Sequence, residues 1–106
     1  MASKNKRAIY PIHPGTVLAD ELAELGMSVA ELARTLRVPY GRVYRLVSRR
    51  RSITADMALR LQQWLGVTAD FWMNLQKRYE FDVAAEAVGA KIGNTFARCA
   101  RPDHAS

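Results

Sequence analysis

Two short helical patterns, separated by only about two residues, constrain the fold of this chain more than any other feature. The first covers residues 28–36, where Ser28 followed by Glu31 forms a capping-box pattern. The second covers residues 39–47 and opens with Pro39, which fits the first turn of a helix. Apolar residues recur at helical spacing in both: Val29, Leu32, Ala33 and Leu36, then Val43, Leu46 and Val47. These patterns predict two helices packed against each other across a tight turn.

The pair has the pattern of a helix-turn-helix motif, because Ala33 is small where the helices would cross and Val38 fills the turn. The second helix has a distinct outward face when Val43 points inward and each residue advances by about 100°. Opposite Val43 lie Gly41, Arg45 and Ser48, with Arg42 and Arg49 on one flank and Tyr40 and Tyr44 on the other. Gly41 leaves this face flat at its N-terminal end, which suits close approach to a groove of DNA.

The positive charge of the chain gathers around this motif. The formal net charge is +6, and residues 34–60 contain eight Arg against one Asp, which leaves the rest of the chain at −1. Clustered positive charge repels itself unless a polyanion neutralises it. The simpler interpretation is a helical hairpin with a solvated basic face, but the segregation of charge favours nucleic acid as the partner.

Arginine can bond a guanine edge through two hydrogen bonds, which gives roughly 1–3 kcal/mol of discrimination between bases. Arg45 is therefore the first predicted base reader, while the arginines at residues 49–51 are predicted to hold backbone phosphates with salt-sensitive affinity. Tyrosine can donate to phosphate or stack on a thymine methyl. The predicted DNA-contacting residues are Ser28, Tyr40, Gly41, Arg42, Tyr44, Arg45, Ser48, Arg49, Arg50 and Arg51.

The remaining helical patterns predict an all-α bundle of five helices. A first helix covers TVLADELAELG and stops at Gly26, and a fourth is capped by Ser52 or Thr54 and ends before Gly66. Thr68 caps a fifth helix that runs into the mid-eighties, because Gly89 and Gly93 weaken any helix beyond. We expect a flexible basic arm over residues 1–11, a folded domain over 12–86 and a tail of uncertain order over 87–106.

Several functions find no support in the sequence. Cys99 stands alone, and no disulfide, metal site or cofactor is expected. A signal peptide and a membrane-spanning stretch are both missing, so we expect a cytoplasmic protein. The chain does not look like an enzyme, because His13 and His104 lie in opposite tails and no nucleophile stands at a telling spacing. Large aromatic residues, Trp64, Phe71 and Trp72, are expected in the core or in a dimer contact rather than around a small molecule.

Four segments carry a resemblance to a known family. They are IHPGTVLADEL at 12–22, the helix pair, RSITADMALRL at 51–61 and FWMNLQKRYEFDVA at 71–84. Together they resemble the HigA-type antitoxins of bacterial toxin–antitoxin modules, which have a lambda-repressor-like helix-turn-helix of the XRE-like superfamily. The HPG segment, the SITAD turn and the FWxNLQxxY helix distinguish this family from ordinary helix-turn-helix repressors.

The resemblance implies a homodimeric antitoxin that neutralises a RelE-like mRNA-cleaving toxin and represses its own operon at a palindromic operator. Dimerisation would use the fifth helix and would set two recognition helices about 34 Å apart in successive major grooves of double-stranded DNA. Two alternatives stay open. One is a stand-alone XRE-type repressor without a toxin partner, and the other is a protein-binding module whose DNA function has decayed.

Two departures from the family pattern affect these expectations. Arg37 replaces the usual turn glycine and must accept a left-handed backbone, which predicts a looser or reshaped turn. Val29 follows Ser28 where the family has glutamine, so one polar DNA contact is missing and the operator cannot be inferred. The toxin would meet acidic residues, either Asp20, Glu21 and Glu24 or Glu80, Asp82 and Glu86, unless both groups are ordinary solvated surface. The arm with Lys4, Lys6 and Arg7 is open between minor-groove contact, toxin contact and disorder.

Overall fold

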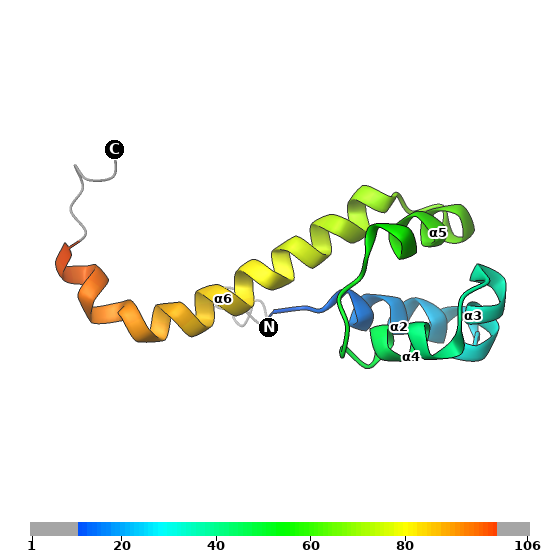
Figure 1. The fold of residues 1–106 in the computed structure, drawn as a ribbon, viewed down its shortest axis with the longest axis horizontal. Helices are drawn as coiled ribbons and strands as arrows, with labels where there is room; N and C mark the ends of the chain where they lie inside the picture. The colour runs from blue at the N-terminus through cyan, green and yellow to red at the C-terminus, as the bar shows by residue number, and fades with distance from the viewer. Residues whose placement is uncertain (1–10, 100–106) are drawn as a thin grey trace.

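Helices joined by short connections make up this computed structural model, which describes residues 11–99. In chain order they are α2 (Pro14–Leu25), α3 (Val29–Leu36), α4 (Tyr40–Val47), α5 (Ala55–Leu65) and α6 (Ala69–Cys99). No strand occurs among the residues that the structure describes. Helices α2 to α5 form a compact head with the start of α6, and the rest of α6 projects from it as a single long rod (Figure 1). The all-α fold expected from the sequence is confirmed.

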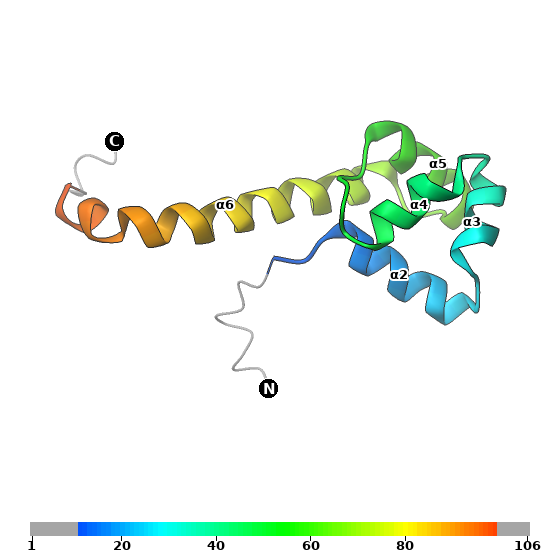
Figure 2. The ribbon, with the colours of Figure 1, turned by 60° about the horizontal axis from the view of Figure 1, so that its bottom comes forward.

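The core of the head draws on every helix. Its buried apolar residues are Leu18, Leu22, Leu32, Ala33, Leu36, Val38, Val43, Leu46, Ile53, Met57, Ala58, Leu61 and Trp72. Helix α4 packs against both α2 and α3, and α5 packs against α3 and α6. Figure 2 shows α2 and α4 side by side in the head, with α6 leaving the head on the side away from α3. The apolar stripes read from the sequence are therefore the faces that meet.

The residues predicted to cap the helices lie at the observed helix boundaries. Ser28 and Glu31 form both hydrogen bonds of the capping box, at 3.0 and 2.9 Å. Of the two candidates for the start of α5, Thr54 is the cap, since its hydroxyl accepts from the Met57 backbone N–H at 3.2 Å. Gly26 and Gly66 adopt the left-handed conformation that only glycine reaches without strain.

Two helix starts differ by a residue or two from the expectation. Helix α2 begins at Pro14 rather than at Thr16, because the His13 side chain caps it by accepting from the Gly15 backbone N–H at 2.8 Å. Pro39 lies just outside α4 with an extended backbone, so it precedes the first turn that it was predicted to occupy. Neither shift changes which side chains of α4 face outward.

Helix α6 is much longer than the sequence predicted. It continues to Cys99 without interruption at Gly89 or Gly93, so the expectation that it ends in the mid-eighties is wrong. One glycine inside a helix costs only about 1 kcal/mol, and the many alanines around these two offset that cost. The expected domain boundary at residue 86 falls inside this helix. The predictions for residues 1–10 and 100–106 lie outside the described residues.

Candidate nucleic-acid interface

Helix α4 presents two exposed tyrosines on one flank. Tyr40 and Tyr44 are 53% and 43% exposed, and their rings stack with centroids 5.9 Å apart and planes 15° from parallel. Residues four apart lie above each other on a helix, which explains the stack. The flank predicted for these tyrosines is therefore present, and the pair forms one flat aromatic surface beside the outward face.

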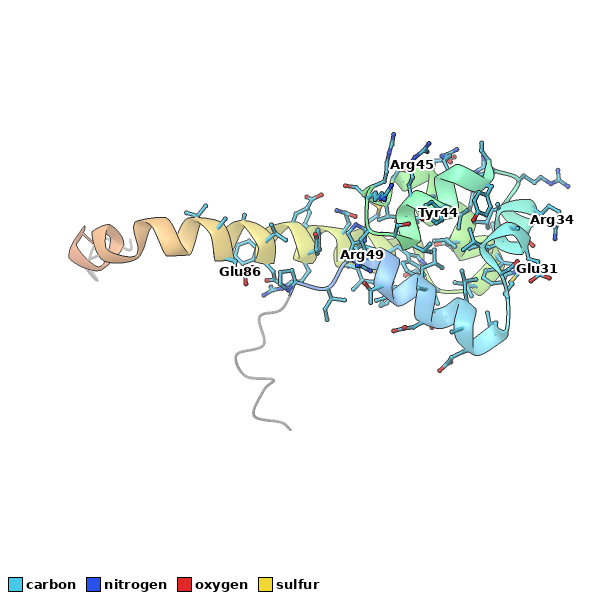
Figure 3. All side chains as sticks on the ribbon, turned by 90° about the horizontal axis from the view of Figure 1, so that it is seen from below. Glu31, Arg34, Tyr44, Arg45, Arg49 and Glu86 are labelled. Atoms are coloured by element: carbon cyan, nitrogen blue, oxygen red, sulfur yellow. The ribbon has the colours of Figure 1, made fainter. Side chains whose placement is uncertain are left out.

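The guanidinium of Arg45 lies back over Gly41, at the N-terminal end of α4. Its two terminal nitrogens lie 3.5 Å from where a Cβ on Gly41 would be. The space above Gly41 is therefore occupied by a charged group. This end of the outward face is not the bare flat surface that the sequence predicted. Arg45 is exposed and projects outward from the head (Figure 3). No acidic partner of Arg45 is found within residues 11–99.

Arg42, one of the predicted DNA-contacting residues, is held by an acid that the sequence did not connect with it. Its Nη2 donates to Asp56 Oδ2 at 3.0 Å, and Arg60 Nε donates to the same oxygen at 3.0 Å. The Arg60 hydrogen bond, with a further one from Arg42, lowers the pKa of Asp56 and keeps its carboxyl ionised. Arg60 also donates to the backbone oxygen of Leu36 at 2.8 Å, so this cluster ties α3, α4 and α5 together.

Arg49 does not share a flank with Arg42, and that part of the angular prediction is wrong. Helix α4 ends at Val47, Ser48 caps it, and Arg49 turns into the left-handed region with φ of 62°. The turn is stabilised by the Arg50 backbone N–H, which donates to the Arg45 oxygen at 2.8 Å. Figure 3 shows Arg49 near the base of α6 and away from Arg45. The Ser48 hydroxyl donates to the backbone oxygen of Tyr44, one turn back in the same helix.

A positively charged hollow lies between α4 and the start of α5. It has a volume of about 200 Å³, and its lining consists of Arg42, Arg45, Leu46, Arg51, Ser52, Thr54 and Met57. Three arginines from α4 and from the loop that follows it therefore meet at one place. The sequence placed Arg51 with Arg49 and Arg50 at the helix end, and it gave no sign that Arg51 would approach Arg45.

The turn between α3 and α4 keeps its hydrogen bonds although a glycine is missing. Arg37 adopts the left-handed conformation, with φ of 60° and ψ of 46°. Its backbone N–H donates to the Arg34 oxygen at 3.2 Å, and that of Val38 donates to the Ala33 oxygen at 3.0 Å. The left-handed backbone is confirmed, and both backbone hydrogen bonds close the turn. The chain accepts a strain of about 1 kcal/mol at Arg37 and keeps the geometry of the motif.

Three segments that are far apart in the sequence meet behind the C-terminal end of α4. Gly15 lies so close to α4 that a Cβ there would overlap the Leu46 backbone oxygen. The rings of His13 and Tyr79 meet edge to face at 4.8 Å. In addition, the backbone N–H of Ile53 donates to the buried Gln76 Oε1 at 2.8 Å. The HPG, SITAD and FWxNLQxxY segments therefore form one structural junction that positions α4.

His13 gives this junction a dependence on pH. Burial lowers the pKa of His13, the charge of Arg49 lowers it further, and a hydrogen bond with the Arg51 backbone acts in the opposite direction. The neutral ring is needed because its Nδ1 accepts from the Gly15 N–H at the start of α2. The unfolded chain would take up a proton near pH 6.5, the ordinary value, while the folded chain resists it.

We expect the free energy of unfolding to fall as the pH drops below about 6.5, because the unfolded state then binds more protons than the folded state. Denaturant titrations between pH 8 and pH 5.5 measure this slope. His13→Asn is the matched control, since asparagine also caps helices but does not titrate. An unchanged slope in the His13→Asn variant would contradict the role given to this ring.

Neither a metal site nor a membrane span is found among the described residues. No group of three or more His, Cys, Asp or Glu side chains lies close enough together there to hold a metal ion. Within the same part of the chain, no helix is both long and apolar enough to cross a membrane.

Comparison with known proteins identifies the class that this fold and surface define. The chain belongs to the helix-turn-helix family, whose family model matches residues 18–72. Virulence-associated protein I of Dichelobacter nodosus is 39% identical over 82 residues, which cover 76% of either chain. The expected helix-turn-helix motif is confirmed by this match and by the observed packing of α3 against α4.

Solved structures identify the branch of the family more closely. An addiction module antidote protein of the HigA family from Coxiella burnetii is 48% identical, with a TM-score of 0.74. The match covers 78% of this chain and 91% of that one. Antitoxin HigA of Pseudomonas aeruginosa, solved with the higBA promoter, is 47% identical with a TM-score of 0.73, over 77% of this chain and 90% of that one. The resemblance to HigA-type antitoxins is confirmed.

Proposed function

We propose that this protein is an antitoxin that binds operator DNA as a homodimer, represses its own operon and neutralises a RelE-like toxin. The observation that carries the DNA-binding part is the exposed face of α4, where Arg45 is free of acidic partners among the described residues and Tyr40 and Tyr44 are stacked beside it. The Pseudomonas HigA structure with its promoter supports the assignment by similarity.

In this proposal the residues around α4 divide the work. Arg45 reads a base edge in the major groove, and the tyrosine pair contacts the backbone or a thymine methyl. Arg49, Arg50 and Arg51 follow the end of α4 and bind phosphates without regard to sequence. The Ser28 backbone and side chain cap α3, and its hydroxyl proton remains available for a phosphate oxygen.

The dimer is proposed to form through α6. Beyond the head this helix exposes Phe81 at 61% and Val88 at 46%, which are seven residues apart and therefore lie on one face. Apolar residues left exposed along one helix are typical of a surface that another chain covers. A two-fold pair would place its two α4 helices in successive major grooves, about 34 Å apart.

The toxin is proposed to bind the acidic surface of α2. Asp20, Glu21 and Glu24 form no ion pair with the side chains that the structure describes, those of residues 11–89. In the competing group on α6, Asp82 pairs with Arg78 at 3.1 Å and Glu80 accepts from Gln76 at 2.9 Å. A hydrogen bond from a neutral amide leaves the charge of Glu80 in place, but the pairing of Asp82 with Arg78 leaves the α2 group with more unpaired negative charge for a basic partner. Because the operator DNA and the toxin are both inside the bacterial cell, we propose that the protein is cytoplasmic.

Co-purification with the product of the neighbouring gene, followed by a gel shift on the operon's own promoter, tests the proposal. We expect a stable complex with a small basic protein, and a shifted band that requires the dimer. Rescue of growth from that toxin should survive Arg45→Ala, because α2 and α4 expose different faces. If no neighbouring gene encodes a toxin and the promoter is still bound, the chain is a stand-alone repressor.

A further inference from the structure

Asp56 is the single acid among residues 34–60, and it lies beside the surface proposed to meet DNA. It stands in the first turn of α5, and its side chain is about half exposed. One oxygen, Oδ2, accepts from Arg42 on α4 and from Arg60 on α5, each at 3.0 Å. An ionised carboxylate at this place repels the phosphates of DNA, so its presence calls for a reason.

Stability alone does not supply that reason. Ion pairs between exposed side chains contribute about 0–1 kcal/mol to folding, and pairs four residues apart on a helix fall within that range. Arg60 already connects α5 to α3 through its hydrogen bond to the Leu36 oxygen. The contact that joins Asp56 to α4 is the one with Arg42, and its direct consequence is to fix where that guanidinium lies.

The two outward arginines of α4 are therefore in different states. Arg45 rests on Gly41 and has no acidic partner among the described residues, whereas Arg42 has one terminal nitrogen committed to Asp56. A guanidinium has five N–H donors in a rigid plane, so fixing one of them orients the others. Arg42 can still donate into the hollow that it lines with Arg45 and Arg51, but from one direction.

We propose that Asp56 is a specificity-determining residue of the DNA interface, acting as a positioning residue that holds the Arg42 guanidinium and denies it to phosphates of unrelated DNA. This inference rests on the proposed DNA-binding function. On random DNA an untethered arginine swings to the nearest phosphate and adds sequence-independent affinity. A tethered arginine contributes only where the DNA offers an acceptor in line with its fixed donors.

Asp56→Asn tests this positioning. The probes are a duplex selected by the wild-type protein from a randomised pool and a scrambled duplex of the same composition. We expect tighter binding of the scrambled duplex, a salt dependence steeper by about one phosphate contact, and a specificity ratio lower by roughly fivefold or more. Thermal melting of each variant checks that the fold is kept.

Asp70→Asn is the matched control, because Asp70 also stands exposed in the first turn of a helix and its loss removes the same charge. The control should raise affinity for both duplexes by one common factor. If Asp56→Asn does the same, Asp56 acts only through net charge and the proposal is overturned.

A second pair of variants separates positioning from direct contact. In an Arg42→Ala background, Asp56→Asn should no longer change the specificity ratio, because the group that it positions is gone. A change of the same size in that background would overturn the proposal. If the wild-type protein enriches no sequence at all from the pool, the proposed DNA-binding function fails and this inference fails with it. An enriched sequence together with equal effects of Asp56→Asn and Asp70→Asn defeats this inference alone.

Discussion

Replacing Arg45 by alanine is expected to abolish the preference for operator over random DNA, with a loss of roughly 1–3 kcal/mol on the specific duplex. Arg45 is the exposed arginine of α4 whose guanidinium lies at the groove-facing end, over Gly41, and is not neutralised by an acid among the described residues. Binding isotherms on the selected duplex and on a scrambled duplex measure the change in each affinity.

Arg50→Ala provides the comparison for that result. Arg50 follows the left-handed turn at the end of α4, so its charge lies outside the helical face that carries Arg45. Its loss should weaken both duplexes alike and reduce the salt slope by about one. Equal losses on specific and random DNA in the Arg45→Ala variant would refute the assignment of Arg45 as a base reader.

Replacing Gly15 by alanine should destabilise the head by about 3 kcal/mol, at the upper end of the usual cost of overpacking. The added methyl group would overlap the Leu46 backbone oxygen, and a backbone carbonyl inside a helix cannot move aside as a side chain can. Helix α2 would have to retreat from α4, and the added methyl group would also crowd the capping His13 Nδ1, 3.1 Å away. For a domain of this size we expect Tm to fall by about 10 °C or more.

Gly41→Ala is the matched substitution, because it adds the same methyl group to a second helical glycine. The nearest atoms there are those of the Arg45 guanidinium at 3.5 Å, which is ordinary contact with a flexible group. Its stability should stay equal to that of the wild type or rise by up to about 1 kcal/mol, the helix preference of alanine over glycine. Equal losses of stability in both variants would show that the close approach of α2 to α4 is not what requires Gly15.

The sequence was a reliable guide where structure depends on neighbours along the chain. The capping box at Ser28, the glycine stops and the inward position of Val43 all follow from local hydrogen bonding and from a period of 3.6 residues. The outward position of Tyr40, Tyr44 and Arg45 follows from the same period. These features needed no knowledge of the rest of the fold.

The sequence was a poor guide where the position of a side chain depends on contact with a segment that is distant in the sequence. The contact of Arg42 with Asp56 joins residues fourteen apart, and the contact of Ile53 with Gln76 joins residues twenty-three apart. Arg49 was misplaced because an angular projection assumes that the helix continues, and arginine gives no signal for a left-handed turn. The length of α6 was missed because glycine was treated as a stop and not as a modest cost.

The length of α6 has a mechanical consequence. At about 1.5 Å of rise per residue, the stretch from Trp72 to Cys99 spans about 40 Å, so a tilt of roughly 10° at its base moves its far end by about 7 Å. The buried side chains of Trp72 and Gln76 anchor the base of this helix in the head, and they therefore set the direction in which the rest of the helix points. If two copies pair along this helix, the distance between their heads is only as well defined as the packing of Trp72 and Gln76 at its base.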